Sequence, residues 1–155
     1  RCNNINNTGT IFIMDKREIT DTIVIHCTQT PPNMDVDVAK VTEWHKDRGF
    51  DTIGYHYLIK RDGTLQTGRD ESLVGAHAVA VNGTSIGVAL AGGGTADMGW
   101  ENNFEPIQFE TLKSIIIKLK DKYSIQKIIG HSEVESTKQC PSFDVQGWLD
   151  KNGLV

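Results

Sequence analysis

Continuous runs of apolar, β-branched residues divide the chain into the strands of a buried sheet. Unbroken runs of this kind are typical of strands that are covered on both faces. Thr22–His26 is such a run and ends in a histidine, and Ile125–Gly130 is another that is followed at once by His131. Ile86–Leu90 reads as a third buried strand. Because sites in α/β sheets favour the carboxyl ends of strands, the two histidines fall where function is expected.

A β-hairpin is predicted between residues 54 and 67. Gly54–Lys60 is rich in strand formers, Asp62-Gly63 is a strong turn signal, and Thr64–Thr67 reads as the returning strand. Strand alternation would place alternate side chains of the first strand on one face, namely Tyr55, Tyr57 and Ile59. The opposite face would then carry Gly54, His56 and Leu58.

Three amphipathic segments predict helices. Asp35 is the expected cap of the first helix, which runs to about Arg48 and stops at Gly49. Pro106 opens the second, whose apolar face recurs at helical spacing: Leu112, Ile115, Ile116, Leu119 and Tyr123. Asp144 caps a short terminal helix that bears Trp148 and Leu149. Strands and helices alternate, so the expected fold class is α/β, a single domain with a central mixed β-sheet flanked by helices.

The first residues differ from the rest. Residues 1–17 are expected to form an N-terminal arm, and residues 18–155 the functional domain. Arg1 to Thr10 are polar and Asn-rich and read as loose chain, whereas Ile11–Met14 is apolar enough for a short strand or a plug against the core. The chain begins at Arg1 rather than Met, which leaves open a removed leader or a longer parent chain.

Composition narrows the classes of function. With 155 residues, 38% hydrophobic and 23% charged, the chain has the make-up of an ordinary globular protein. A net charge of −4 gives no sign of a nucleic-acid partner, and none is expected. No apolar run approaches the ~20 residues of a membrane helix, so no membrane insertion is expected. The compartment stays open.

Three cysteines are too few and too irregular for a disulfide framework. A disulfide between Cys2 and Cys27 stays open. Cys27 would point away from His26 if the strand continues through it, and is then a core thiol.

Two histidines and the third cysteine form the candidate chemical centre. His26 and His131 follow strands that could be neighbours, and Cys140 lies nine residues after His131 in a loop that can fold back. Neutral imidazoles with one thiolate suit zinc, and three protein ligands leave a position for water. The spacing alone also fits surface histidines and a small buried cysteine, so that reading stays open.

Nearby residues could add to this centre. Lys138 lies two before Cys140 and would face the same side of an extended loop, where an ammonium lowers a thiol pKa or stabilises an oxyanion. A solvated loop lysine is the alternative. His77 lies in a Gly-rich loop, where a histidine often meets substrate, whereas His45 on the first helix is expected to be structural.

Ordered motifs over residues 22–155 match a known family. The matching stretches are Ile25-His26-Cys27-Thr28, Trp44-His45-Lys46, Gly54 to Gly63, Gly68 to Glu71, Val74 to Ala78, Asn82, Ser85 to Val88 and Lys138 to Asp144. On these motifs the chain resembles the zinc-dependent N-acetylmuramoyl-L-alanine amidases of the type-2 class, which share their fold with peptidoglycan recognition proteins. The resemblance is strongest to the small T7-type phage lysozymes.

The resemblance implies a function and a site. One Zn²⁺ per chain would be bound by His26, His131 and Cys140, and Tyr55 and Lys138 would assist catalysis. The substrate would be the muramyl peptide of peptidoglycan, cut at the amide that joins N-acetylmuramic acid to L-alanine, as in endolysins. By the same resemblance, two residues would lie in the substrate groove, His77 and Asn82, and the protein would act as a monomer.

Three other functions stay open. The chain could be a module that binds peptidoglycan without cutting it, although such members of the family typically lack the zinc-binding cysteine, and Cys140 is present. It could be a thiol hydrolase, with Cys140 as nucleophile and His131 as base. A muramidase-type glycosidase would need paired carboxylates, and no evident pair is formed by Asp62, Asp70, Glu71 and Glu133.

Overall fold

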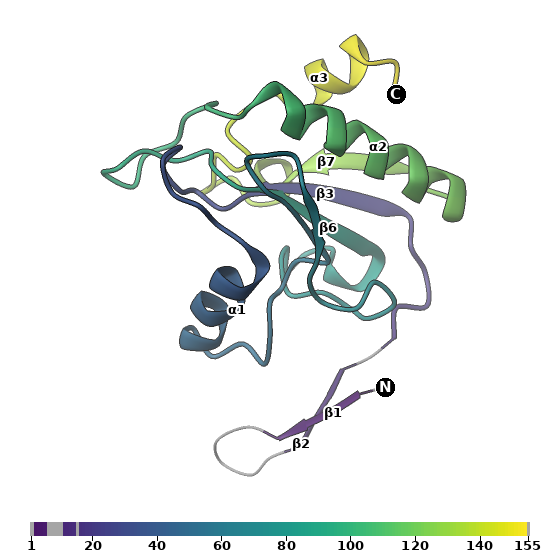
Figure 1. Cartoon of the computed structure of the whole chain (residues 1–155). Helices are drawn as coiled ribbons and strands as arrows, with labels where there is room; N and C mark the ends of the chain where they lie inside the picture. Colours follow the sequence, from purple (N-terminus) through teal and green to yellow (C-terminus); the bar gives the residue numbers. More distant parts are fainter. Residues whose placement is uncertain (1, 6–10, 15, 155) are drawn as a thin grey trace.

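A five-stranded mixed sheet is the framework of the protein in the computed structural model, which describes residues 2–5, 11–14 and 16–154 (Figure 1). In the order β5-β4-β6-β3-β7, its strands are β5 (Leu65–Thr67), β4 (Tyr57–Ile59), β6 (Ser85–Leu90), β3 (Thr22–Cys27) and β7 (Lys127–Gly130). β3 runs parallel to both β6 and β7, β4 is parallel to β6, and β5 is antiparallel to β4. The predicted mixed sheet is confirmed.

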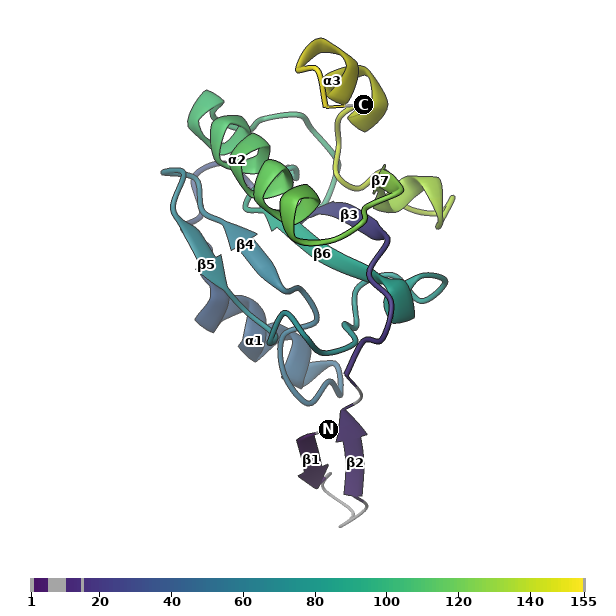
Figure 2. The ribbon, with the colours of Figure 1, turned by 90° about the vertical axis from the view of Figure 1, so that its right-hand side faces the viewer.

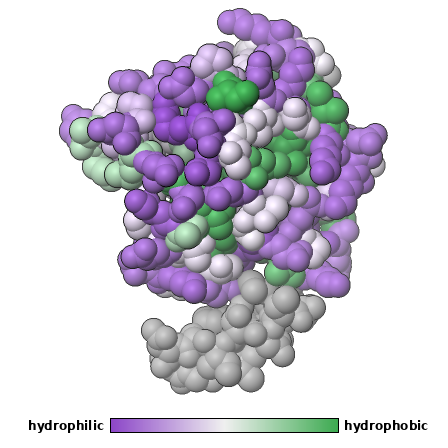
Figure 3. Space-filling model, viewed as in Figure 1, coloured by the Kyte–Doolittle hydropathy of each residue, from purple (hydrophilic) through white to green (hydrophobic). Residues whose placement is uncertain are grey.

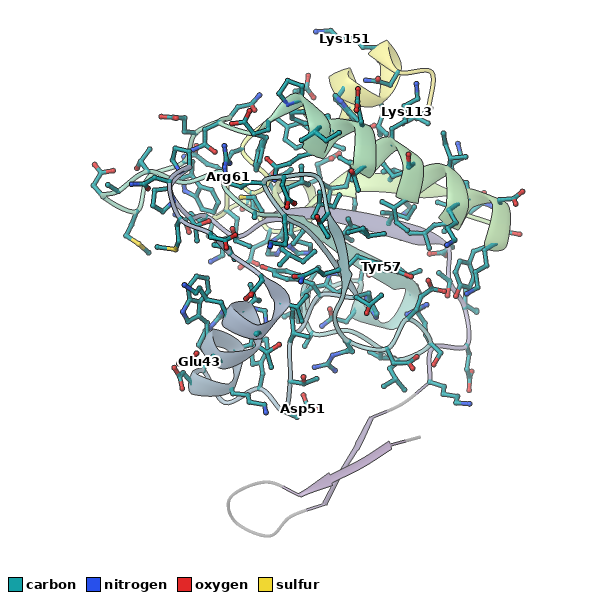
Figure 4. The ribbon with its side chains drawn as sticks, in the orientation of Figure 1. Glu43, Asp51, Tyr57, Arg61, Lys113 and Lys151 are labelled. Atoms are coloured by element: carbon teal, nitrogen blue, oxygen red, sulfur yellow. The ribbon has the colours of Figure 1, made fainter. Side chains whose placement is uncertain are left out.

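Helices cover both faces of this sheet. α1 (Val38–Asp47) lies on one face, and α2 (Pro106–Lys122) and α3 (Val145–Lys151) lie on the other, where α3 contacts β7 (Figure 2). Glu43 on α1 and Lys113 on α2 mark the two opposite outer faces (Figure 4). The predicted α/β fold of one sheet flanked by helices is thereby confirmed.

Strand alternation divides the core into two layers. Ile23 and Ile25 of β3 pack in the layer under α2. This layer also takes four of the five residues predicted for the apolar face of α2, which are at most 3% exposed: Leu112, Ile115, Ile116 and Leu119. The fifth, Tyr123, follows the last residue of the helix and is only partly buried. The layer under α1 contains Leu58 and Ala89. Because side chains alternate along β3, His26 points to the α1 side of the sheet.

The ends of the helices follow local chemistry. α1 is capped by Asp37 rather than by the predicted Asp35, because the Asp37 carboxylate accepts a hydrogen bond from the Lys40 amide at 2.8 Å. Gly49 has the positive φ of +94° that a helix stop of this kind requires, as predicted. The predicted cap Asp144 is confirmed, since its carboxylate accepts from the Gly147 amide.

The predicted alternation of the first hairpin strand is wrong at Tyr55. The chain bends at residues 54 and 56, and β4 begins only at Tyr57. Tyr57 and Ile59 therefore pack in the layer under α2, whereas Tyr55 packs with Leu58 in the layer under α1. The bend moves Tyr55 to the face of the sheet on which His26 lies.

A second, two-stranded sheet lies at the N-terminus, apart from the main sheet (Figure 1). β1 (Cys2–Ile5) pairs with β2 (Ile11–Met14) in antiparallel register. The predicted strand at 11–14 is confirmed, while the expectation of loose chain is wrong for residues 2–5, because pairing of main-chain groups needs no apolar pattern. Residues 1 and 6–10 lie outside the described part. Cys27 is a free, buried thiol, so the Cys2–Cys27 disulfide is not formed.

The outer surface is mainly polar. The face shown in Figure 3 is largely hydrophilic, with hydrophobic side chains in smaller patches. In the part of the chain that the structure describes, no helix combines the length and the apolar content that crossing a membrane requires.

Candidate active site

The two predicted histidine ligands meet at one edge of the sheet. β3 and β7 are parallel neighbours, and their register pairs Ile25 with Gly130. The next residues, His26 near the end of β3 and His131 directly after β7, therefore lie side by side, and their ring centroids are 4.5 Å apart. The prediction that the two strands are neighbours is confirmed.

Cys140 reaches the same point because the chain folds back after β7. The short 3₁₀ turn η2 (His131–Glu133) begins this loop, and the Ser132 amide donates to the Cys140 carbonyl at 2.9 Å. The Cys27 amide donates to the Cys140 sulfur at 3.1 Å, which fixes the thiol beside β3. Cys140 Sγ then lies 3.9 Å from His26 Nδ1.

These three residues form a group that could hold a metal ion. One ligand atom from each of His26, His131 and Cys140 lies within 4.8 Å of the other two. Burial lowers the pKa of His26 well below its ordinary value, and the neighbouring His77 and His131 lower it further. Burial also raises the pKa of the Cys140 thiol. The His26 imidazole is therefore neutral and has an electron pair to give to a metal, and the Cys140 thiol loses its proton when a cation binds.

A surface cavity of about 560 Å³ opens over this group. All seven residues proposed from the sequence line it: His26, Tyr55, His77, Asn82, His131, Lys138 and Cys140. Arg48, Trp100 and Glu135 also line it and were not singled out in the sequence. The cavity gives a substrate access to the metal-binding group from one side.

Tyr55 lies directly beside the first histidine. Its ring is tilted against His26 with centroids 5.0 Å apart, and it also contacts His45 at 5.2 Å. Burial raises the pKa of Tyr55 well above its ordinary value. Its hydroxyl is therefore a proton donor at neutral pH. His45 accepts a hydrogen bond from the Gly54 amide at 2.9 Å, in line with its expected structural role.

The loop between His131 and Cys140 carries two charged groups. Lys138 is exposed at the rim of the cavity, with its amide bonded to the Glu135 carbonyl at 3.1 Å. The Glu135 carboxylate lies 3.0 Å from His131 Nε2. Glu135 was missed in the sequence, where its only signal is an acidic residue four positions after a candidate ligand.

His77 and Asn82 lie in the cavity wall, where their contacts are with the protein itself. His77 Nδ1 is 2.8 Å from His26 Nε2, and the His77 side chain is buried. Asn82 Oδ1 accepts from the amides of His77 and Ala78 at 2.9 and 2.8 Å. A role of these two residues in binding substrate stays a prediction.

The fold and site define a protein of the α/β class with a His-His-Cys group in an open cavity. A family model described as N-acetylmuramoyl-L-alanine amidase matches residues 15–143. The endolysins of Escherichia phage T7 and Klebsiella phage KP32 are 45% and 44% identical to this chain over 140 residues, which is 90% of the chain and 92% of each relative. Among solved structures, the amidase LysC from Clostridium intestinale URNW is similar, with a TM-score of 0.78, 31% identity and coverage of 93% and 92% of the two chains.

The chain belongs to the N-acetylmuramoyl-L-alanine amidase family. It is an enzyme that hydrolyses the amide bond between N-acetylmuramic acid and L-alanine in peptidoglycan. The predicted family and activity are confirmed, and the alternatives of a non-cutting binding module and of a glycosidase are set aside.

Proposed function

We propose that this amidase depends on one Zn²⁺ ion per chain, held by His26, His131 and Cys140. Zn–N and Zn–S bonds of roughly 2.0–2.3 Å place two donors of a tetrahedral site roughly 3.3–3.6 Å apart. The 3.9 Å between His26 Nδ1 and Cys140 Sγ needs only a small closure to reach that separation. Imidazole and thiolate donors also select zinc over magnesium or calcium. When bound, zinc polarises a carbonyl and lowers the pKa of a water to about 7.

Tyr55 is proposed to handle the proton that the reaction must move. Its hydroxyl is protonated at neutral pH and lies on the cavity beside His26. A phenol in this state orients the attacking water or gives a proton to the departing amine, which cannot leave as an anion. The bend before β4 provides this placement, since it turns Tyr55 toward the site.

Lys138 is proposed to stabilise the negative charge that forms on the substrate oxygen. Its side chain is exposed at the rim of the cavity, outside the group of metal ligands. An ammonium group directed at a developing oxyanion lowers the barrier without binding the metal. Lys138 is therefore expected to affect turnover and not metal content.

The remaining parts follow from the cavity. We propose that the muramyl peptide lies in it along the wall formed by His77 and Asn82, and that the protein acts as a monomer on the cell wall. Residues 18–155 would carry this activity, with residues 1–17 as an arm. The volume of about 560 Å³ is sufficient for a small part of a polymeric substrate.

The products test the function. Purified peptidoglycan should release fragments with free L-alanine amino termini and no new reducing ends. A strong chelator should stop the release, and added Zn²⁺ should restore it. Chelation also separates this proposal from a thiol hydrolase that uses Cys140, because a thiol reagent would inactivate both enzymes and a chelator only the zinc enzyme. Full hydrolysis by metal-free protein would refute the proposal.

A further inference from the structure

His26 uses its two ring nitrogens in opposite directions. Its side chain is 1% exposed, so both nitrogens must find partners within the protein. Nδ1 faces Cys140 Sγ at 3.9 Å, on the side where the metal ligands meet. Nε2 faces His77 Nδ1 at 2.8 Å on the other side. One of these two contacts involves the ring proton, and the neighbours of His77 decide which.

The hydroxyl of Ser85 determines where the protons lie. Ser85 Oγ donates its single proton to the Val81 carbonyl at 2.7 Å. At its contact with His77 Nε2, 3.3 Å long, the same oxygen can then only accept. His77 must therefore carry its proton on Nε2, which leaves Nδ1 as an acceptor. His26 in turn donates from Nε2, and its Nδ1 keeps the lone pair that a metal requires.

The chain has a space shaped for the His77 ring. A side-chain carbon on Gly87 of β6 would lie 2.6 Å from His77 Cγ, and one on Gly75 would lie 2.5 Å from His77 Cδ2. Both distances are too short for real atoms, so any larger residue at either position would displace the imidazole. Asn82 holds the amide of His77 at the same time. The position of the ring is thus set by one strand, by the loop that contains Gly75 and by the short turn that Asn82 begins.

We propose that His77 is a positioning residue, which acts through His26 by holding it in the tautomer with Nδ1 free for the metal. The proposal rests on the proposed function, because it needs His26 to be a zinc ligand. Outer partners of this kind fix the orientation of a metal-binding histidine and its basicity. His77 is 8% exposed, and both of its ring nitrogens are hydrogen-bonded within the protein, so its main contact is with the proposed metal ligand His26.

The first test reads the tautomers directly in the metal-free wild-type protein. Two-bond ¹H–¹⁵N correlation spectra of the histidine rings should show His26 and His77 both protonated at Nε2 and bare at Nδ1. A proton on His26 Nδ1 would overturn the proposal. This measurement needs no variant and so does not depend on whether a substitution folds.

The second test measures zinc affinity by competition with a chelator. His77→Leu removes the acceptor and should weaken zinc binding by about 10- to 100-fold. His77→Asn places an amide oxygen near the position of Nδ1 and should recover most of the loss. Ser85→Ala frees His77 to change tautomer and should give a smaller loss in the same direction.

A matched control is Gln108→Leu. Gln108 is also a fully buried polar residue, bonded to the carbonyls of Ile59 and Ala91 and to the Glu105 amide, and it lies on α2, away from His77 and from the metal-binding group. Its loss should lower stability and leave zinc affinity unchanged. Equal zinc affinity in wild-type and His77→Leu proteins would overturn the positioning role alone, whereas a wild-type protein that binds no zinc would overturn the proposed function.

Discussion

The two histidines of the metal-binding group are supported in different ways. His26 lies inside β3 and is backed by the neutral ring of His77 in the protein interior. His131 follows the end of β7 and is backed by the Glu135 carboxylate, whose side chain is 45% exposed. One support depends on packing and a chain of neutral hydrogen bonds, and the other on a charge near solvent. The support of His26 should be rigid and sensitive to any change of shape. The support of His131 should tolerate changes of shape and be sensitive to salt.

The largest expected effect, loss of zinc and of activity, is the same for the two histidines. His26→Ala and His131→Ala each remove one of three proposed ligands, so both variants should lose zinc and all detectable release of stem peptides. The measurement is zinc content per chain together with the peptidoglycan assay. Lys138→Ala and Tyr55→Phe are the controls, since both should keep zinc and lose most turnover. Zinc loss in the Lys138 variant would show that its role is structural.

Stability should separate the two histidines. In the metal-free protein, His26→Ala leaves a cavity and an unpaired acceptor on His77, and should cost about 2–4 kcal/mol of unfolding free energy. His131→Ala removes a ring that is 12% exposed and its hydrogen bond to Glu135, and should cost less, about 1–2 kcal/mol. Urea unfolding with chelator present measures both. Equal losses would contradict the distinction between a packed and a solvated support.

The sequence predicts the part of this site that main-chain geometry determines. Two parallel strands that end in histidine must present them at one edge, and the helical spacing from Leu112 to Leu119 does place that face in the core. The position of Tyr55 cannot be predicted in this way, because the chain bends at residues 54 and 56 and the alternation that the strand-forming residues indicate ends there.

The contact between His77 and His26 could not be predicted either. It depends on the absence of side chains at Gly87 and Gly75, which the sequence marks only as two glycines. The cap of α1 is a milder case, since Asp35 and Asp37 are both suitable residues and only the turn before the helix decides between them. The sequence predicts features that residues close together in the chain determine, such as helix caps. It does not predict contacts between segments that are distant in the chain.

His56 tests what burial alone does to a histidine in this protein. Burial lowers its pKa to about 4, although its hydrogen bond to Leu73 opposes the shift. Folded His56 is therefore neutral where the unfolded chain, with a pKa of about 6.5, takes up a proton. The contribution of neutral His56 is full above about pH 6.5 and is lost as the pH falls toward 4, by up to about 1.4 kcal/mol per pH unit. His56→Asn should flatten the stability profile of the metal-free protein over this range, measured by urea unfolding. An unchanged slope would show that His56 is already protonated when folded.

The smallest expected effect lies on the exposed side of the comparison. Glu135→Gln keeps a hydrogen-bond acceptor 3.0 Å from His131 and removes only the charge, so zinc binding should weaken by about 10-fold or less. The loss should shrink as salt is raised, because the carboxylate is exposed and its field is screened within about 10 Å at 0.1 M salt. Glu110 is an exposed carboxylate on α2, so Glu110→Gln is the matched control and should leave zinc affinity unchanged.

His77→Leu should instead show a loss of zinc affinity that salt does not alter, since no charge takes part in the contact of His77 with His26. If salt changed the loss of zinc affinity equally in Glu135→Gln and His77→Leu, the two supports would not differ in kind. The contact between His77 and His26 would then have to act through the charge of the whole site.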